Sequence, residues 1–229
     1  MKIKSALFTE ASGSLGGLTA SRNRGGQYLR ARAIPVNPNT PQQQAIRGFV
    51  ANLTSLWNST LSAAQRTSWD EYALNVPLPD PLGEPRNVGG LAMYVRSNVP
   101  RLQAALPRVD TGPEVFNLGP FTNPVFATFA AATQDFQVTF DNTDAWANED
   151  DSAMLVLGSR PQNDAINFFK GPYRFAGSID GDAATPPTSP ATIVNPFVFG
   201  VGQRVFVQAR VSRADGRLTL PFRGNGLGA

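Results

Sequence analysis

The sequence of 229 residues contains neither cysteine nor histidine, and lysine occurs only at Lys2, Lys4 and Lys170. Without cysteine there are no disulfides and no thiolate chemistry, and without either residue there are no zinc sites built on sulfur or imidazole. Ser-His-Asp and Cys-His catalysis lack their base, and a histidine switch near neutral pH is excluded. Carboxylates, metals held by oxygen ligands and three lysines are the catalytic routes left. We therefore expect a protein that is not an enzyme and that carries no cofactor and no metal.

A long apolar run is also absent. No segment approaches the roughly 20 apolar residues that span a bilayer, and the apolar part of the N-terminus is too short for a secretory signal. We expect no membrane association, with synthesis in a cytoplasm. Apolar residues still make up 41% of the chain and charged residues 16%, which predicts a packed core rather than disorder.

Positive charge is concentrated at the start of the chain. Residues 1–48 contain seven basic side chains and one acidic side chain, whereas the remainder contains 13 basic and 16 acidic ones. A net charge of +6 on this segment, against −3 on the rest, indicates an acidic partner, either nucleic acid or an acidic protein surface. Arginine outnumbers lysine 17 to 3, and arginine is the cation best suited to buried interfaces.

Residues 1–40 form the first of three predicted regions and are rich in glycine, serine and arginine. Within residues 27–32, charged or aromatic side chains alternate with apolar ones, the period of a strand. We predict a β-hairpin or an extended arm, which buries little against itself and needs a partner surface on this chain or on a neighbour. The predicted interaction residues are Arg22, Arg24, Tyr28, Arg30 and Arg32.

Residues 41–108 form the second region, which the pattern predicts to be helical. Thr40 precedes Pro41 and is followed three residues later by Gln43, as at a capped helix start. This helix is predicted to end near residues 58–60. A second helix is predicted to start at Ser62, with Gln65 completing a capping box.

A third helix is predicted over residues 88–99, and Pro100 can kink it rather than end it. Three large aromatic residues, Trp57, Trp69 and Tyr94, fall in this region. They could form a ligand platform, but at helical spacing they are more often core residues. The three helices thus predict a small helical module.

Residues 109–229 form the third region, with short alternating segments and turn signals between them. Seven strands are predicted, at residues 125–131, 136–140, 153–157, 173–179, 193–198, 204–211 and 217–222. Asp-Gly chemistry in residues 212–216 predicts a hairpin turn. This pattern is typical of an immunoglobulin-like or fibronectin-like antiparallel β-sandwich. The glycine-rich tail, 223–229, is expected to need an external partner. The fold class is therefore predicted to be α+β.

The acidic residues 141–144 and 149–151 are the one carboxylate cluster. They could bind calcium, which takes oxygen ligands from loops, but the spacing of an EF-hand is missing, so a solvated loop is the simpler interpretation. Asp70 and Glu71 are adjacent on a helix and point in different directions, so they do not form a catalytic pair.

Glycines in residues 13–17 faintly resemble a phosphate-binding loop but lack its Gly-Lys-Ser/Thr ending. Residues 22–28 combine arginine, glycine and tyrosine, as nucleic-acid-binding segments do. Contact between these arginines and an acidic surface of a neighbouring subunit explains the same combination of residues equally well.

Several motifs in residues 1–105 resemble a family of phage- and prophage-encoded proteins. These motifs are residues 12–17, 21–28, 35–40 and 61–66, with Gln44, Arg47, Trp69, Tyr72 and residues 89–94. The resemblance implies phage origin and location in the virion, with assembly in the host bacterial cytoplasm, and it transfers no catalytic residues. The expected function is a capsid decoration or minor capsid protein that clamps neighbouring virion subunits through its arm, as part of an oligomer. A head–tail connector or tail component is one alternative, and a nucleic-acid-binding accessory protein is another.

Overall fold

The structure is a computed structural model in which residues 12–23, 26–34, 36–79, 83–119 and 121–229 are described. It divides into two compact units, Met1–Pro41 and Gln42–Ala229, which we call unit 1 and unit 2. The predicted α+β class is confirmed, because three helices and several open antiparallel sheets are present.

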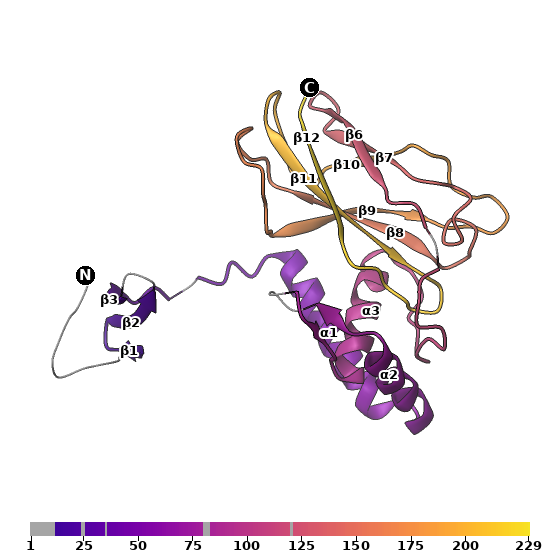
Figure 1. Cartoon of the computed structure of the whole chain (residues 1–229), viewed down its shortest axis with the longest axis horizontal. Coiled ribbons are helices and arrows are strands. Elements are labelled where there is room, and N and C mark those ends of the chain that lie inside the picture. Colours follow the sequence, from indigo (N-terminus) through magenta and orange to yellow (C-terminus); the bar gives the residue numbers. More distant parts are fainter. Residues whose placement is uncertain (1–11, 24–25, 35, 80–82, 120) are drawn as a thin grey trace. The chain divides into compact units, whose positions relative to one another are not determined.

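Unit 1 contains an antiparallel sheet in the order β1-β2-β3 (Figure 1). Its strands are β1 Gly13–Leu15, β2 Leu18–Asn23 and β3 Gly26–Ala31. Gly16 lies in the turn between β1 and β2 with φ of +55°, a left-handed conformation that glycine adopts without a steric penalty. The predicted hairpin is confirmed as β2 and β3, and β1 adds a strand that the sequence pattern did not predict.

Three helices open unit 2: α1 Pro41–Ser59, α2 Ala63–Asn75 and α3 Gly90–Gln103. The capping box of α2 is confirmed, because the Ser62 hydroxyl accepts from the Gln65 backbone N–H and the Gln65 side chain accepts from the Ser62 N–H. Pro100 lies inside α3 and does not end it, as predicted. The cap at Thr40 stays a prediction. Between α2 and α3, the short strands β4 Leu78–Pro79 and β5 Pro85–Arg86 pair antiparallel.

Aromatic rings form the centre of the helical part. Trp69 and Tyr94 are fully buried, and their ring centroids lie 5.6 Å apart in an edge-to-face arrangement. Trp57 is half-buried and packs on Tyr94 at 5.5 Å. Such pairs stabilise a core beyond the burial of their area. The core interpretation of these aromatic residues is therefore confirmed. None of the three helices, among the residues described, is both long and apolar enough to cross a membrane.

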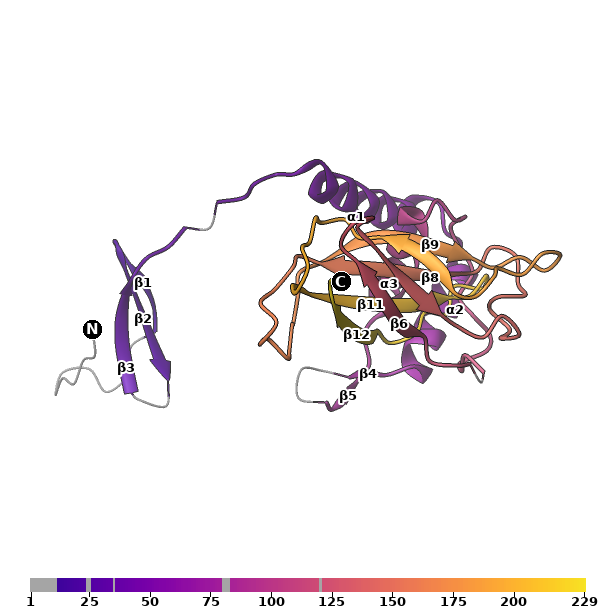
Figure 2. The same ribbon diagram turned by 90° about the horizontal axis from the view of Figure 1, so that it is seen from above.

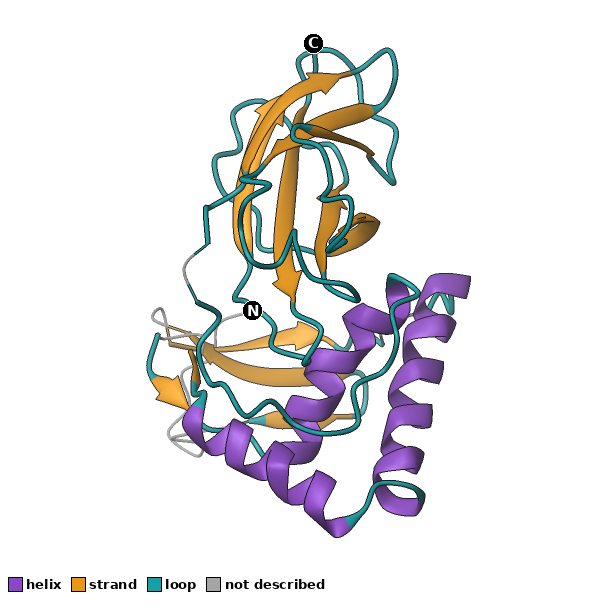
Figure 3. Ribbon diagram, turned by 90° about the vertical axis from the view of Figure 1, so that its right-hand side faces the viewer, coloured by secondary structure: helices purple, strands orange, loops and turns teal. Residues whose placement is uncertain are grey.

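Two antiparallel sheets make up the rest of unit 2. One has the order β10-β7-β6 (Figure 1), and the other has the order β12-β11-β8-β9 (Figure 2). The bounds of the strands are β6 Val125–Ala130, β7 Asp135–Thr139, β8 Ala153–Ser159, β9 Tyr173–Asp180, β10 Ala191–Val194, β11 Arg204–Ser212 and β12 Phe222–Leu227. Figure 3 shows the helices gathered beside one end of these strands.

One hydrophobic core joins the two sheets. Alternate residues of β7, such as Phe136 and Val138, are buried together with alternate residues of β8 and β11, such as Val156 and Val207. Phe140 and Trp146, whose rings lie 5.2 Å apart, continue the core beyond the end of β7. The period of two at residues 136–140 therefore correctly identified the buried face of β7.

The position predicted for the last strand is wrong. Residues 217–221 form no regular strand, and β12 lies in the glycine-rich tail, paired along its length with β11. Gly224 and Gly226 lie directly beneath the rings of Phe126 and Phe129, where a Cβ atom would overlap the aromatic carbons. The glycines therefore allow the rings to approach the strand. The tail finds its pairing partner within the chain, rather than outside it as predicted.

Candidate functional site

Two of the predicted interaction residues share one face of the sheet in unit 1. Tyr28 is paired with Ser21, and Arg30 is paired with Thr19. Because residues opposite each other in an antiparallel pair lie on the same face, this face is polar, with one aromatic ring and one guanidinium group. The Thr19 hydroxyl lies 2.9 Å from that of Ser14, which extends the same face onto β1.

The other predicted interaction residues are placed differently. Arg22 is paired with Gln27 and therefore lies on the opposite face from Tyr28. Arg32 follows β3, and its backbone N–H donates to the carbonyl of Gly17 at 2.8 Å. Arg24 lies outside the described residues. Among the described arginines, Arg22 and Arg30 thus lie on opposite faces of the sheet.

The face opposite Tyr28 and Arg30 is mostly apolar. Leu18 is paired with Ala31, and Ala20 is paired with Leu29. Leu18 keeps 48% of its surface exposed, so this face is partly open. The sheet therefore has one polar and one apolar face, and each is suited to a different kind of contact.

Arg101 connects the helices of unit 2 to the four-stranded sheet. Its side chain is fully buried at the end of α3 and donates four hydrogen bonds. The acceptors are the Pro107 carbonyl at 2.9 Å, the Ser212 hydroxyl at 3.2 Å, the Arg213 carbonyl at 2.7 Å and the Asp151 carbonyl at 3.0 Å. Burial lowers the pKa of the Arg101 guanidinium, with partial compensation from nearby acidic residues. Neutral oxygens thus satisfy a buried cation, as buried charge requires.

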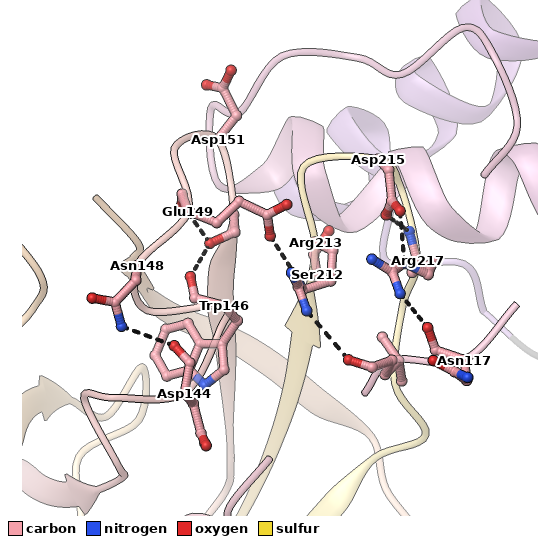
Figure 4. A network of polar contacts seen from close by, with 12 residues as sticks. Asn117, Asp144, Trp146, Asn148, Glu149, Asp151, Ser212, Arg213, Asp215 and Arg217 are labelled. Atoms are coloured by element: carbon pink, nitrogen blue, oxygen red, sulfur yellow. Dashed lines mark hydrogen bonds and ion pairs between the residues drawn. The ribbon is translucent and has the colours of Figure 1, made fainter. Parts of the chain in front are cut away.

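A second polar network surrounds the hairpin that follows β11 (Figure 4). Arg213 forms an ion pair with Glu149 and donates to the Leu118 carbonyl at 3.2 Å. Arg217 pairs with Asp215 at 2.6 Å and donates to the Asn117 carbonyl. The predicted turn is confirmed here, with Gly216 at φ of +92°.

An open cavity of about 610 Å³ lies beside this network. Its lining mixes polar and apolar residues, and the polar ones include Asn117, Thr122, Asp144, Arg213 and Arg217. Both arginines are already engaged by Glu149 and Asp215 and by backbone carbonyls. The hydrogen bonds of these groups hold Asn117, Leu118 and the turn at 213–217 in place beside the sheet. We see in them no nucleophile joined to a general base.

The acidic residues of the predicted carboxylate cluster act within loops. Asp141 accepts from the backbone N–H and hydroxyl of Thr143, and these hydrogen bonds lower the pKa of Asp141. Asp144 accepts from the Thr122 N–H at 2.8 Å. Across the part of the chain that the structure describes, no three acidic side chains gather closely enough to hold a metal ion. These contacts are those of loop capping, in line with the solvated-loop interpretation.

Sequence reasoning missed Arg101, although the signal was present. Buried residues of α3 recur as Met93, Tyr94, Ser97, Asn98 and Arg101, one continuous helical stripe. An arginine on the buried stripe of a helix indicates a buried acceptor set on a neighbouring element. Three of its four acceptors, however, come from residues 50 and more positions away in sequence, so no local pattern predicted the set.

Comparisons of the sequence with family models and curated proteins, and of the fold with solved structures, found no match.

Proposed function

We propose that the chain is a non-enzymatic structural subunit of a bacteriophage particle and that it attaches to neighbouring subunits through the sheet of unit 1. The observation that carries the proposal is the two-faced character of this small, separate sheet. Its strands are only three to six residues long, so the sheet buries little area by itself and would gain stability by docking on another surface. The apolar face around Leu18 supplies hydrophobic contact with the neighbouring subunit. The polar face around Arg30 supplies charged hydrogen bonds that fix the register of the contact.

For the β region of unit 2, we propose an immunoglobulin-like or fibronectin-like sandwich. Supporting this, residues from β7, β8 and β11 share one core, and all strand pairs are antiparallel. In the proposed role this region is the rigid module that the attached subunit presents on the particle. The resemblance of residues 1–105 to phage and prophage proteins supports the same assignment.

Capsid decoration or a minor capsid role is the first choice within this proposal, and a connector or tail role is the alternative. The two differ in copy number and symmetry. Many copies over the shell support decoration, whereas a single ring around the tail axis supports a connector or tail component. Counting copies per particle by quantitative mass spectrometry distinguishes them.

The proposal is tested by deleting residues 1–33 from the chain and measuring its incorporation into particles made from the genome that encodes it. We expect unit 2 to remain folded and incorporation to be lost. Two point variants separate the faces: Leu18→Glu changes the apolar face and Arg30→Glu changes the polar one. Ser55→Glu, on the exposed side of α1, is the matched control and should incorporate normally. Normal incorporation of the truncated chain would overturn the proposal.

Nucleic-acid binding is the second candidate, favoured by Tyr28 and its neighbour Arg30 on one face of β3. A phosphate-dominated contact weakens steeply with added salt. Salt-sensitive DNA or RNA binding that Arg30→Glu abolishes and Leu18→Glu preserves would favour this candidate over the structural role.

A further inference from the structure

The strands of the four-stranded sheet run between two ends that differ in charge. At one end, loops 160–172 and 195–203 lead into β9 and β11, and the C-terminus lies beside them (Figure 1). We call this the basic end, since it carries Arg160, Lys170, Arg174 and Arg204 against one acidic residue, Asp164. At the other end, β8 begins and β9 finishes. We call it the acidic end, formed by residues 149–151 and 180–182.

The arginines of the basic end are held in place by neutral groups. Arg160 and Arg174 lie over the ring of Phe197, with guanidinium carbons 5.4 Å and 4.9 Å from its centroid. Arg204 donates to the Asp164 carbonyl at 2.9 Å and to the Asn225 side chain at 2.6 Å. None of the ion pairs among the described residues involves these three arginines. Their positive charges are therefore positioned but not neutralised.

Large apolar side chains project from the same two loops. Phe168 is 71% exposed, Val198 is 81% exposed and Val201 is 78% exposed. Single exposed apolar residues are ordinary, but three on adjacent loops, surrounded by ordered cations, are typical of an interaction surface. The charge on this surface calls for a partner rich in carboxylates.

The acidic end offers such carboxylates. Asp150, Asp151, Asp180 and Asp182 are all exposed there. Asp150 and Asp182 each accept backbone N–H groups from residues 183–185 through one carboxylate oxygen, which fixes their orientation. Asp151 points away from the network of Glu149 and Arg213 (Figure 4). Unlike Glu149, these four have no ion pair among the described residues.

We infer that copies of the chain associate head to tail, with the basic end of one copy bound to the acidic end of the next. Four cations face four carboxylates, and the two sets lie at opposite ends of the same strands, so one molecule cannot pair them internally. Each contact of this kind leaves one free end of each sign, so association continues into a ring or a filament. The inference uses unit 2 alone and does not depend on the proposed role of unit 1.

The test is sedimentation of the full chain at low and high ionic strength, with two neutralised variants. Arg160→Gln/Arg174→Gln removes charge from the basic end, and Asp151→Asn/Asp180→Asn removes it from the acidic end. Asn tolerates the left-handed backbone of Asp151, whose φ is +59°, and the carbonyl that binds Arg101 is unchanged. Arg47→Gln/Arg86→Gln, at exposed positions of unit 2 away from both ends, is the matched control with the same change in charge.

We expect the parent chain and the control to form large species at low salt that dissociate as salt screens the contact. Each variant alone should be monomeric. An equimolar mixture should form dimers and nothing larger, since it retains one intact basic end and one intact acidic end. A parent chain that stays monomeric at low salt overturns the inference, as does association that either variant leaves unchanged. Binding of the monomer to DNA or to anionic vesicles, lost in the basic-end variant, would assign this surface to another partner.

Discussion

At the scale of single residues, Arg101 makes a buried connection between the helices and the four-stranded sheet. It is a buried cation without a carboxylate partner, and four neutral oxygens from three separate segments surround it. Hydrogen bonds that involve a charged group contribute more than neutral ones, and an acceptor left unsatisfied in the interior is unfavourable. The helical part and the sheet therefore share one buried connection that depends on a guanidinium group.

Replacing Arg101 with methionine keeps much of its volume and removes all four hydrogen bonds. We expect Arg101→Met to lower the free energy of unfolding by about 3 kcal/mol, because the buried acceptors lose a charged donor. The control Arg108→Met breaks the ion pair with Asp110, which is partly exposed, and should lower it by no more than about 1 kcal/mol. Urea denaturation measures both. Equal losses in the two variants would contradict the role of Arg101.

At the scale of elements, β12 illustrates how packing determines a strand. Its sequence alternates glycine with larger residues, which by propensity disfavours a strand. The structure nevertheless pairs it with β11, because Gly224 and Gly226 admit Phe126 and Phe129 from β6. Ala229 then exchanges backbone hydrogen bonds with Phe129 and Ala131, so the end of the chain joins the two sheets.

A single methyl group tests this arrangement. We expect Gly226→Ala to lower the free energy of unfolding by about 2 kcal/mol, because the added Cβ overlaps the ring of Phe129 and forces the sheets apart. Gly200→Ala is the control, since its Cβ meets only Gln203 at an ordinary 3.6 Å, and its change should stay within about 0.5 kcal/mol. Thermal or urea unfolding compares them. A Gly226→Ala variant as stable as the control would show that the rings do not require glycine.

At the scale of the whole molecule, the helices and the β region fall within one compact unit. Besides Arg101, two further side chains join the helices to the β region. Arg96 donates to the Leu218 and Thr219 carbonyls, and the ring of Trp69 lies against Gly216. The sequence predicted separate regions at 41–108 and 109–229. The division of these regions into separate domains stays a prediction. The contacts that join them favour cooperative unfolding of the two parts.

Unfolding of one variant tests the cooperativity directly. In Trp57→Phe/Trp69→Phe the remaining tryptophan, Trp146, reports on the β region by fluorescence, while circular dichroism at the helical band reports on the helices. We expect the two urea transitions to coincide, because neither part loses its contacts without exposing the other. Trp146→Phe is the reciprocal control, in which fluorescence reports on the helical part. Transitions with different midpoints would establish two independently folding domains.

Local signals account for what the sequence predicted well. The capping pair Ser62 and Gln65 fixed the start of α2, Pro41 fixed the start of α1, and alternation located β7 and β11 closely. Each depends on residues a few positions apart, whose interactions are the same in any fold. The absence of cysteine and histidine excluded whole classes of chemistry in the same direct way.

The sequence by itself therefore determined the α+β class, most element positions and the chemistry that the chain does not have. Only the tertiary structure decided that the glycine-rich tail is a strand, that Arg101 is buried and satisfied, and that opposite charges collect at opposite ends of the sheets. The physical reason is distance along the chain. These features arise where segments 50 to 120 positions apart pack together, and their stability depends on partners that no local pattern specifies.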